Sequence, residues 1–231
     1  MVVHKPLQLP LDLVLDAAHN RDDLVVGPSN EQAVALIERW PDWPAPVAVL
    51  AGPPGSGKTH LAAIWREMSG ARSLTADQLT EGVDAAEQGP VLIDDLDSAP
   101  LDEVGMFHLI NAVRQNGTSL LIVSRRFPQA WGVKLPDLAS RLKAVTTVEI
   151  HEPDDMLMMA VVTKLFSDRQ VEVEPHVVQF LVRRIERSLS AAMEVVARLD
   201  RAALERQCRV SRALAAEIVA QMDGGQQSLD V

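Results

Sequence analysis

A glycine-rich segment, which lies between a predicted strand and a predicted helix, limits the possible folds of this chain more than any other part of the sequence. Residues 52–59 read GPPGSGKT and fit the pattern G-x-x-x-x-G-K-[ST] at every fixed position. Apolar residues 46–52 predict a buried strand before it, and residues 59–70 predict a helix after it that ends at Gly70. This order predicts a loop whose backbone N–H groups surround phosphate oxygens at a helix N-terminus.

The same loop supplies the expected contacts to a nucleotide. We expect Lys58 to reach the β- and γ-phosphates and Thr59 to help hold Mg²⁺. The cofactors predicted are therefore ADP or ATP, with Mg²⁺. A glycine-rich turn without a ligand is the alternative, and the flanking strand and helix argue against it. The remaining expected cofactor-binding residues are Gly52, Pro53, Pro54, Gly55, Ser56 and Gly57.

A second apolar run, residues 89–95, ends in two adjacent acids. Asp94 is predicted to hold Mg²⁺ through water, and Asp95 to polarise the water that attacks the γ-phosphate. Paired acids are also common where strands end in ordinary loops. The glycine-rich loop upstream favours the nucleotide interpretation.

Strands and helices alternate from residue 24 to residue 150. Further strands are predicted at 118–124 and 145–150, and further helices at 101–117 and 135–144. Alternation of this kind predicts an α/β fold with a parallel sheet covered on both faces.

The strands stop after residue 151, and four helices are predicted in the remainder: 152–169, 174–188, 190–207 and 211–222. The fold class is thus a P-loop parallel-sheet domain followed by a small all-helical domain. We divide the chain into an N-terminal tail (1–20), an α/β domain (21–151), a helical lid (152–222) and a polar tail (223–231).

Composition excludes some classes of protein. The chain has 22 Lys and Arg against 32 Asp and Glu, a net charge of −10, which argues against broad coating of nucleic acid. The one cysteine, Cys208, cannot form an intramolecular disulfide. No apolar run is long enough for a membrane span, and prolines interrupt the apolar N-terminal stretch. We therefore expect a cytoplasmic protein.

Four segments together resemble the DnaA-related branch of the AAA+ ATPase family: residues 24–37, 91–97, 123–142 and 151–185. They resemble its opening box, its double aspartate, its sensor 1 segment with the arginine-finger helix, and the start of its lid. The resemblance implies that Ser124 contacts the nucleotide as sensor 1. It also implies that Arg141 is an arginine finger presented in trans to a partner's γ-phosphate. From the residues alone, a solvated surface arginine is the preferred interpretation of Arg141.

Two positions depart from that branch. Ser190 aligns with its sensor 2 arginine, and Arg187, nearly one turn earlier, is the alternative residue for that contact. Arg125 stands where the branch often has an acid. Both departures predict at most weak intrinsic ATPase activity and a nucleotide held as a structural ligand.

About ten residues follow the last predicted helix, so we expect no C-terminal DNA-binding domain and no direct sequence-specific DNA binding. An AAA+ core with a lid resembles the Hda group of DnaA regulators, which also carries an N-terminal clamp-binding peptide of the form Q-x-x-L-x-L. Residues 8–13 fit that form, with the expected contacts at Gln8, Leu9, Leu11 and Leu13.

The resemblance implies a negative regulator of replication initiation. It would bind the sliding clamp (the β subunit of DNA polymerase) and promote hydrolysis of ATP on DnaA in trans. The alternative is an autonomous DnaA-like AAA+ ATPase that acts as a loader or remodeller. We expect no membrane partner, and a homo-oligomer is compatible with the sequence.

Overall fold

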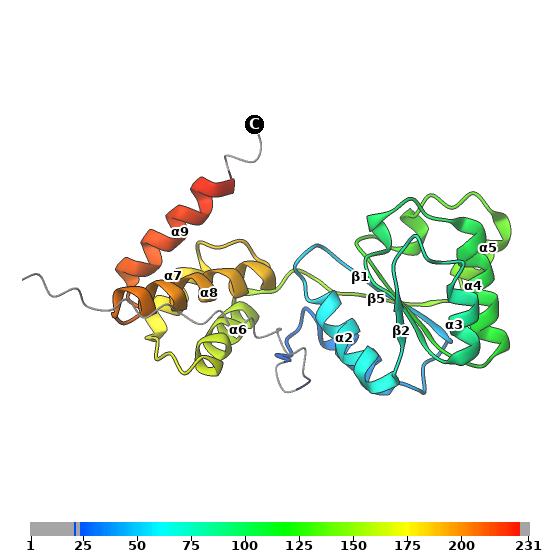
Figure 1. Cartoon of the computed structure of the whole chain (residues 1–231), viewed down its shortest axis with the longest axis horizontal. Coiled ribbons are helices and arrows are strands. Elements are labelled where there is room, and N and C mark those ends of the chain that lie inside the picture. Colours follow the sequence, from blue (N-terminus) through cyan, green and yellow to red (C-terminus); the bar gives the residue numbers. More distant parts are fainter. Residues whose placement is uncertain (1–20, 22–23, 227–231) are drawn as a thin grey trace, which may run out of the picture. The chain divides into compact units, whose positions relative to one another are not determined.

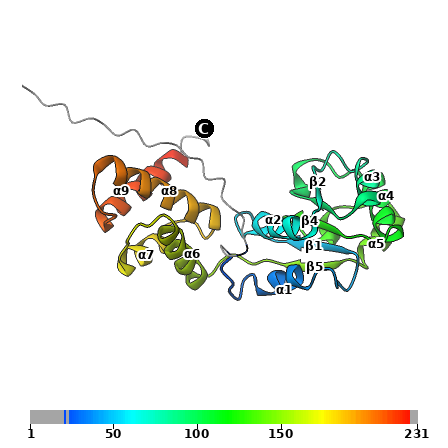
Figure 2. The same cartoon turned by 60° about the horizontal axis from the view of Figure 1, so that its bottom comes forward.

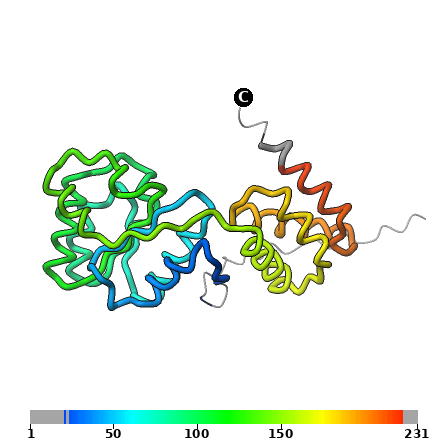
Figure 3. Tube along the Cα trace, turned by 180° about the vertical axis from the view of Figure 1, so that it is seen from behind, coloured from blue at the N-terminus to red at the C-terminus, as the bar shows by residue number. Residues whose placement is uncertain are grey.

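The computed structural model describes residue 21 and residues 24–226, with side chains described as far as Met222. Contacts divide the chain between Pro153 and Asp154 into two compact units (Figure 1). We call the unit before this division the sheet domain and the unit after it the helical domain. Figure 3 traces the chain from the sheet domain into the helical domain.

The sheet domain contains five parallel strands in the order β2-β3-β4-β1-β5. Every residue of β1, β3 and β4 is buried, as expected of strands covered on both faces. Register pairs Ala51 with Ser124, so β1 and β4 end at the same edge. The strands are β1 (Val47–Ala51), β2 (Arg72–Leu74), β3 (Val91–Ile93), β4 (Leu120–Ser124) and β5 (Thr146–Glu149).

Helices cover both faces of the sheet (Figure 2). Alternate strand residues point to opposite faces, so Val49 packs with α3, α4 and α5, whereas Leu50 packs with α1 and α2. These five helices are α1 (Glu31–Arg39), α2 (Lys58–Ser69), α3 (Gly82–Gln88), α4 (Glu103–Gln115) and α5 (Pro136–Leu142). The predicted α/β fold with a parallel sheet is confirmed.

The helical domain consists of four described helices around an apolar core that includes Phe166, Leu181 and Val195. Local signals in the sequence set the starts of the helices: Asp154 and Ser188 cap α6 and α8 with their side chains, and Pro175 begins α7. The helices are α6 (Asp155–Asp168), α7 (Pro175–Val182), α8 (Leu189–Arg206) and α9 (Arg212–Gln226). The prediction of a helical lid is confirmed.

The structure adds elements that the sequence did not specify. β2 has three residues, two of them exposed, and α3 has seven, so neither shows a readable period. α9 continues to Gln226, beyond the predicted end at 222, because a glycine pair costs a helix only about 1 kcal/mol per residue and does not end it as proline would. Within the described part of the chain, no helix is long and apolar enough to cross a membrane.

Candidate functional site

The glycine-rich loop connects β1 to α2, as predicted, and two of its glycines have backbone angles that only glycine adopts readily. Gly55 and Gly57 have φ values of 71° and 97°. A Cβ on Gly52 would overlap the carbonyl oxygen of Ile150, which lies just after β5. The shape of the loop therefore depends on the motif glycines and on the close approach of the neighbouring chain segment.

Lys58 begins α2 and its side chain folds back over the loop. Its Nζ donates hydrogen bonds to the carbonyl oxygens of Gly52 (2.8 Å) and Pro53 (2.7 Å). Burial lowers the pKa of the Lys58 ammonium below its ordinary value, and the nearby positive charge of Arg125 adds to this effect. The loop carbonyls thus hold a desolvated cation beside the N-terminus of α2.

Two further groups fit a phosphate with a divalent cation. The hydroxyl of Ser56 is buried in the loop and has no hydrogen-bond partner among the described residues. Thr59 Oγ1 donates to Asp94 Oδ1 over 3.4 Å, so the two predicted Mg²⁺-binding side chains lie together. Burial raises the pKa of the Asp94 carboxyl, because a low-dielectric environment disfavours the charged form. Oxygen donors of this kind suit Mg²⁺.

Asp95 follows Asp94 at the end of β3, with φ at 50°, in the left-handed region. Its carboxylate lies 3.8 Å from Nη2 of Arg125, which follows β4. Asp95 therefore lies at the expected edge of the sheet. Arg125 lies beside it, which the sequence analysis did not predict.

Ser124, at the end of β4, is buried and belongs to a group that we call the Asp97 cluster: Asp97, Ser124, Arg125, Arg126 and Trp131. Its hydroxyl donates to Asp97 Oδ2 (2.8 Å) and accepts from the Trp131 indole N–H (3.1 Å). Ser124 is thus engaged within the protein at the position predicted for sensor 1.

Asp97 is the residue of this region that sequence reasoning missed. Burial opposes its ionisation, but hydrogen bonds from the Arg125 N–H, the Ser124 hydroxyl and the Arg126 side chain outweigh that effect, so its pKa lies below the ordinary value. The available signal was a third acid in the segment VLIDDLD, two residues after Asp95.

Arg141 lies in the last turn of α5 and is half-buried. Its side chain makes no hydrogen bond or ion pair with any described residue. No described carboxylate therefore forms an ion pair with the Arg141 guanidinium.

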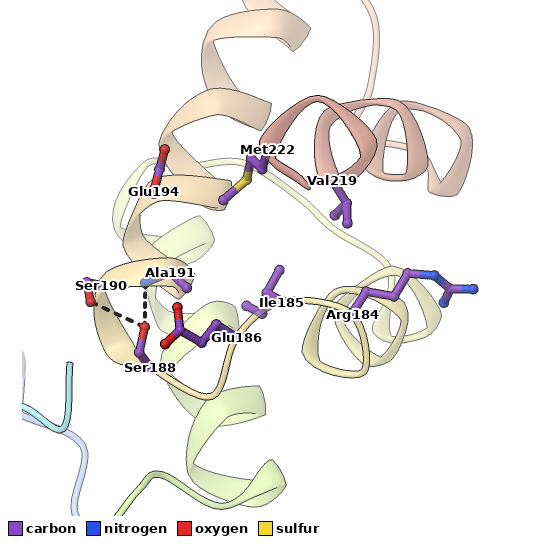
Figure 4. A pocket seen from close by; sticks show the side chains of 9 residues that line it. All are labelled: Arg184, Ile185, Glu186, Ser188, Ser190, Ala191, Glu194, Val219 and Met222. Carbon is purple, nitrogen blue, oxygen red and sulfur yellow. Dashed lines mark hydrogen bonds between the residues drawn. The ribbon is translucent and has the colours of Figure 1, made fainter. Parts of the chain in front are cut away.

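The two residues considered for sensor 2 lie at the start of α8 in the helical domain. Ser190 lines a pocket of about 130 Å³, and its hydroxyl lies 3.3 Å from that of the capping residue Ser188 (Figure 4). Arg187 instead pairs with Asp155, with 2.9 Å between Nη2 and Oδ1. Arg187 therefore already has an anionic partner, whereas Ser190 has a neutral one.

The predicted clamp-binding residues Gln8, Leu9, Leu11 and Leu13 lie outside the described residues.

Comparison with known proteins supports the fold class. Residues 155–217 match the family model for the lid domain of Hda. Domain III of the replication initiation protein DnaA from Thermotoga maritima superposes with a TM-score of 0.74 at 20% identity, over 94% of this chain and 98% of that chain. AMPPCP-bound DnaA from Aquifex aeolicus gives a TM-score of 0.67 at 19% identity, over 80% of this chain and 65% of that chain.

A curated but uncharacterised protein of Haemophilus influenzae is 27% identical over 223 residues, which is 89% of this chain and 94% of that protein. The similarity therefore extends through both domains. The fold class expected from the sequence is confirmed: the chain has the fold of DnaA domain III, and its helical segment 155–217 matches the model for the Hda lid domain.

Proposed function

We propose that this DnaA-related AAA+ protein, whose lid matches that of Hda, is a negative regulator of replication initiation that promotes hydrolysis of DnaA-bound ATP. The observation that carries the proposal is the match of residues 155–217 to the Hda lid domain, because that model describes Hda itself, whereas the solved DnaA structures show the shared fold alone. Proteins of the Hda group, by the resemblance already described, inactivate the initiator.

A bound nucleotide, which we propose to be ADP, would be a structural ligand. Lys58, the Ser56 hydroxyl and the loop N–H groups would hold its phosphates, and Thr59 with Asp94 would hold Mg²⁺. Its phosphate charge would offset the cost of burying Lys58 beside Arg125. The solved Aquifex structure holds AMPPCP in DnaA, which supports nucleotide binding by this fold.

Arg141 would supply the chemistry in trans. Because its guanidinium pairs with none of the described residues, its charge and N–H donors are available to another molecule's phosphate. An arginine finger stabilises charge on the transferring phosphoryl group and contributes about 10³–10⁵ in rate. Placed at the ATP site of DnaA, Arg141 would convert the initiator to its ADP-bound form.

Residues 8–13 would recruit the protein to the sliding clamp on DNA. In an extended peptide, Leu11 and Leu13 can enter an apolar pocket while the Gln8 amide makes hydrogen bonds. Pro10 restricts the free peptide and lowers the entropic cost of binding.

The test is single-turnover hydrolysis of ATP preloaded on DnaA, measured with this protein, ADP and DNA-loaded clamp. We expect faster hydrolysis with the wild type and a loss of at least about 100-fold of the stimulated rate with Arg141→Ala. Lys143→Ala, which removes an exposed cation just after the same helix, is the matched control and should retain stimulation. Full stimulation by Arg141→Ala would exclude Arg141 as the finger.

Clamp recruitment is tested separately by capture on immobilised clamp. Gln8→Ala and the double variant Leu11→Ala/Leu13→Ala should lose capture, and Val14→Ala, just beyond the motif, should keep it. Unchanged capture of the double variant would remove the clamp from the proposal.

The second candidate is an autonomous DnaA-like ATPase that acts as a loader or remodeller. The position of Asp94 and Asp95 beside the glycine-rich loop favours it, because a water-polarising acid serves the chain's own nucleotide. Substantial ATP turnover by the chain alone, abolished by Asp95→Asn, would select this candidate.

A further inference from the structure

Two arginines of the helical domain lie against one aromatic ring. The Cζ atom of Arg184, which follows α7, lies 4.0 Å from the centroid of the Phe180 ring, and that of Arg212, at the start of α9, lies 5.2 Å from it. Both distances are in the range of a cation–π contact. Only 8% of Phe180 is exposed, whereas both arginines are exposed. The ring therefore holds two like charges near each other at the surface.

Neither guanidinium has a described anionic partner. The side chains of Arg184 and Arg212 make no hydrogen bond or ion pair with any described residue. Figure 4 shows the Arg184 side chain extending away from the two carboxylates drawn there, Glu186 and Glu194. Like charges repel each other, so an anion that accepted hydrogen bonds from both guanidiniums would stabilise their arrangement.

Two further arginines lie beside this pair in the chain. Arg183 directly precedes Arg184, and Arg209 lies three residues before Arg212, between α8 and α9. Both are exposed, and neither side chain makes a hydrogen bond or ion pair with a described residue. Three other exposed arginines of this domain do pair with carboxylates: Arg187, Arg198 and Arg206. We call residues 183, 184, 209 and 212 the arginine surface.

The apolar side chains between these arginines indicate the kind of partner. Val182 and Val210 are buried, and the Phe180 ring is covered. At these positions the surface therefore lacks an exposed apolar side chain of the kind that anchors a protein partner. It also lacks an open aromatic face on which a base of a single strand could stack. Exposed guanidiniums without either feature fit the phosphates of a duplex, which each guanidinium can contact through two N–H groups.

We propose that the arginine surface binds the phosphate backbone of duplex DNA. Contacts to phosphate carry no sequence information, so this binding is independent of sequence. The net charge of −10 opposes the attraction of DNA, and we therefore expect weak binding, with a dissociation constant of about 10⁻⁵ M at low salt. A second contact that held the protein on DNA would raise the effective concentration of this surface. The inference does not rest on the proposed function.

The experiment titrates a short fluorescent duplex with the full chain and measures anisotropy at about 50 to 200 mM salt. Two duplexes of unrelated sequence should bind equally. Four phosphate contacts predict that the logarithm of the affinity falls with the logarithm of salt concentration at a slope of about −3 to −4. Absence of binding at about 10⁻⁴ M protein in the lowest salt overturns the proposal.

The double variant Arg184→Gln/Arg212→Gln should raise the dissociation constant by about tenfold or more and make the salt slope shallower by about 2. Arg72→Gln/Arg169→Gln is the matched control, because it removes the same charge from two exposed arginines, one in β2 and one after α6. The control should bind like the wild type. An equal loss in both double variants would attribute binding to net charge and overturn the proposal.

A second pair of substitutions covers the case in which loss of the contacts with Phe180 unfolds the helical domain. Arg183→Gln/Arg209→Gln removes two charges from the arginine surface and leaves both contacts with the ring in place. It should also make the salt slope shallower by about 2. Circular dichroism identifies the variants that fold. If every folded variant of the arginine surface binds the duplex like the control, the proposal is wrong.

Two competing ligands separate a duplex from other anionic partners. We expect the duplex to bind more tightly than labelled polyglutamate of equal total charge, and at least as tightly as one of its own single strands. Tighter binding of polyglutamate, lost in Arg184→Gln/Arg212→Gln, would assign the surface to an acidic protein segment instead. Tighter binding of the single strand would likewise overturn the proposal. These assays contain neither DnaA nor the clamp, so their outcome is separate from that of the proposed function.

Discussion

Thr59 Oγ1 donates a hydrogen bond to Asp94 Oδ1 over 3.4 Å, and this contact joins the first turn of α2 to the end of β3. The same Asp94 oxygen accepts from the backbone N–H of Asp95 at 3.0 Å. Two donors only partly offset the burial of the carboxylate, whose pKa is raised. The contact brings together the two residues proposed to hold Mg²⁺. Burial of the Asp94 carboxylate lowers the stability of the folded protein.

Asp94→Asn tests this cost. We expect the nucleotide-free variant to be more stable than the wild type at neutral pH by about 0.5–2 kcal/mol, because the amide oxygen can accept the same hydrogen bonds without a buried charge. Stabilisation by Mg²⁺ with ADP should be largely lost. Urea unfolding with and without the ligand checks both, and Asp42→Asn at an exposed position is the control.

The raised pKa of Asp94 predicts how the difference in unfolding free energy between the wild type and Asp94→Asn depends on pH. Between the ordinary value of 3.8 and the raised folded value, the folded state binds the Asp94 proton more tightly than the unfolded state does. Wild-type stability, measured relative to Asp94→Asn, should therefore fall as the pH rises through that window and remain lower above it. A difference that does not vary with pH would contradict the assignment.

Lys58→Ala should lower ADP affinity by about 10- to 100-fold, because a hydrogen bond to a charged group contributes about 1.5–3 kcal/mol. Since burial lowers the pKa of Lys58, wild-type affinity should also decline as the pH rises through that lowered value, where the ammonium loses its proton. Titration calorimetry across alkaline pH measures both effects. Lys143→Ala should bind ADP like the wild type.

Gly52→Ala should destabilise the sheet domain by about 1–3 kcal/mol, because the added methyl group overlaps the Ile150 carbonyl oxygen. Gly89→Ala is the control, since a Cβ there meets no atom within 4 Å and its backbone is extended. Its effect should stay within about 0.5 kcal/mol. Equal unfolding midpoints in urea for the two variants would contradict the close approach at Gly52.

Phe166→Ala should destabilise the helical domain by about 3–5 kcal/mol, because this fully buried ring packs within the apolar core of α6–α9. Phe166→Leu preserves more of the volume and should cost less than about 1.5 kcal/mol. Hydrogen exchange locates the effect, and protection should fall in α6–α9. A loss of protection confined to the strands would contradict the assignment of Phe166 to a core separate from that of the sheet domain.

Much of the fold could be predicted because its signals are local. The strand before Gly52, the helix after Lys58 and the proline that starts α7 are each specified by neighbouring residues. The three-residue strand β2 could not be predicted in this way. It pairs with β3 through backbone hydrogen bonds, and its first two residues are exposed, so no apolar period marks it.

The candidate site also contains some features that local sequence predicts and others that depend on packing. The glycine-rich loop and the two acids after β3 could be predicted from local sequence, because a phosphate-binding turn and a strand-end carboxylate each need particular residues at fixed spacing. The approach of Arg125 to Asp95 and the contact of Asp97 with the segment after β4 depend instead on how the strands pack. Asp97 and Arg125 are 28 residues apart in the chain. They meet because β3 and β4 are neighbours in a parallel sheet, and strand order depends on the packing of the whole domain.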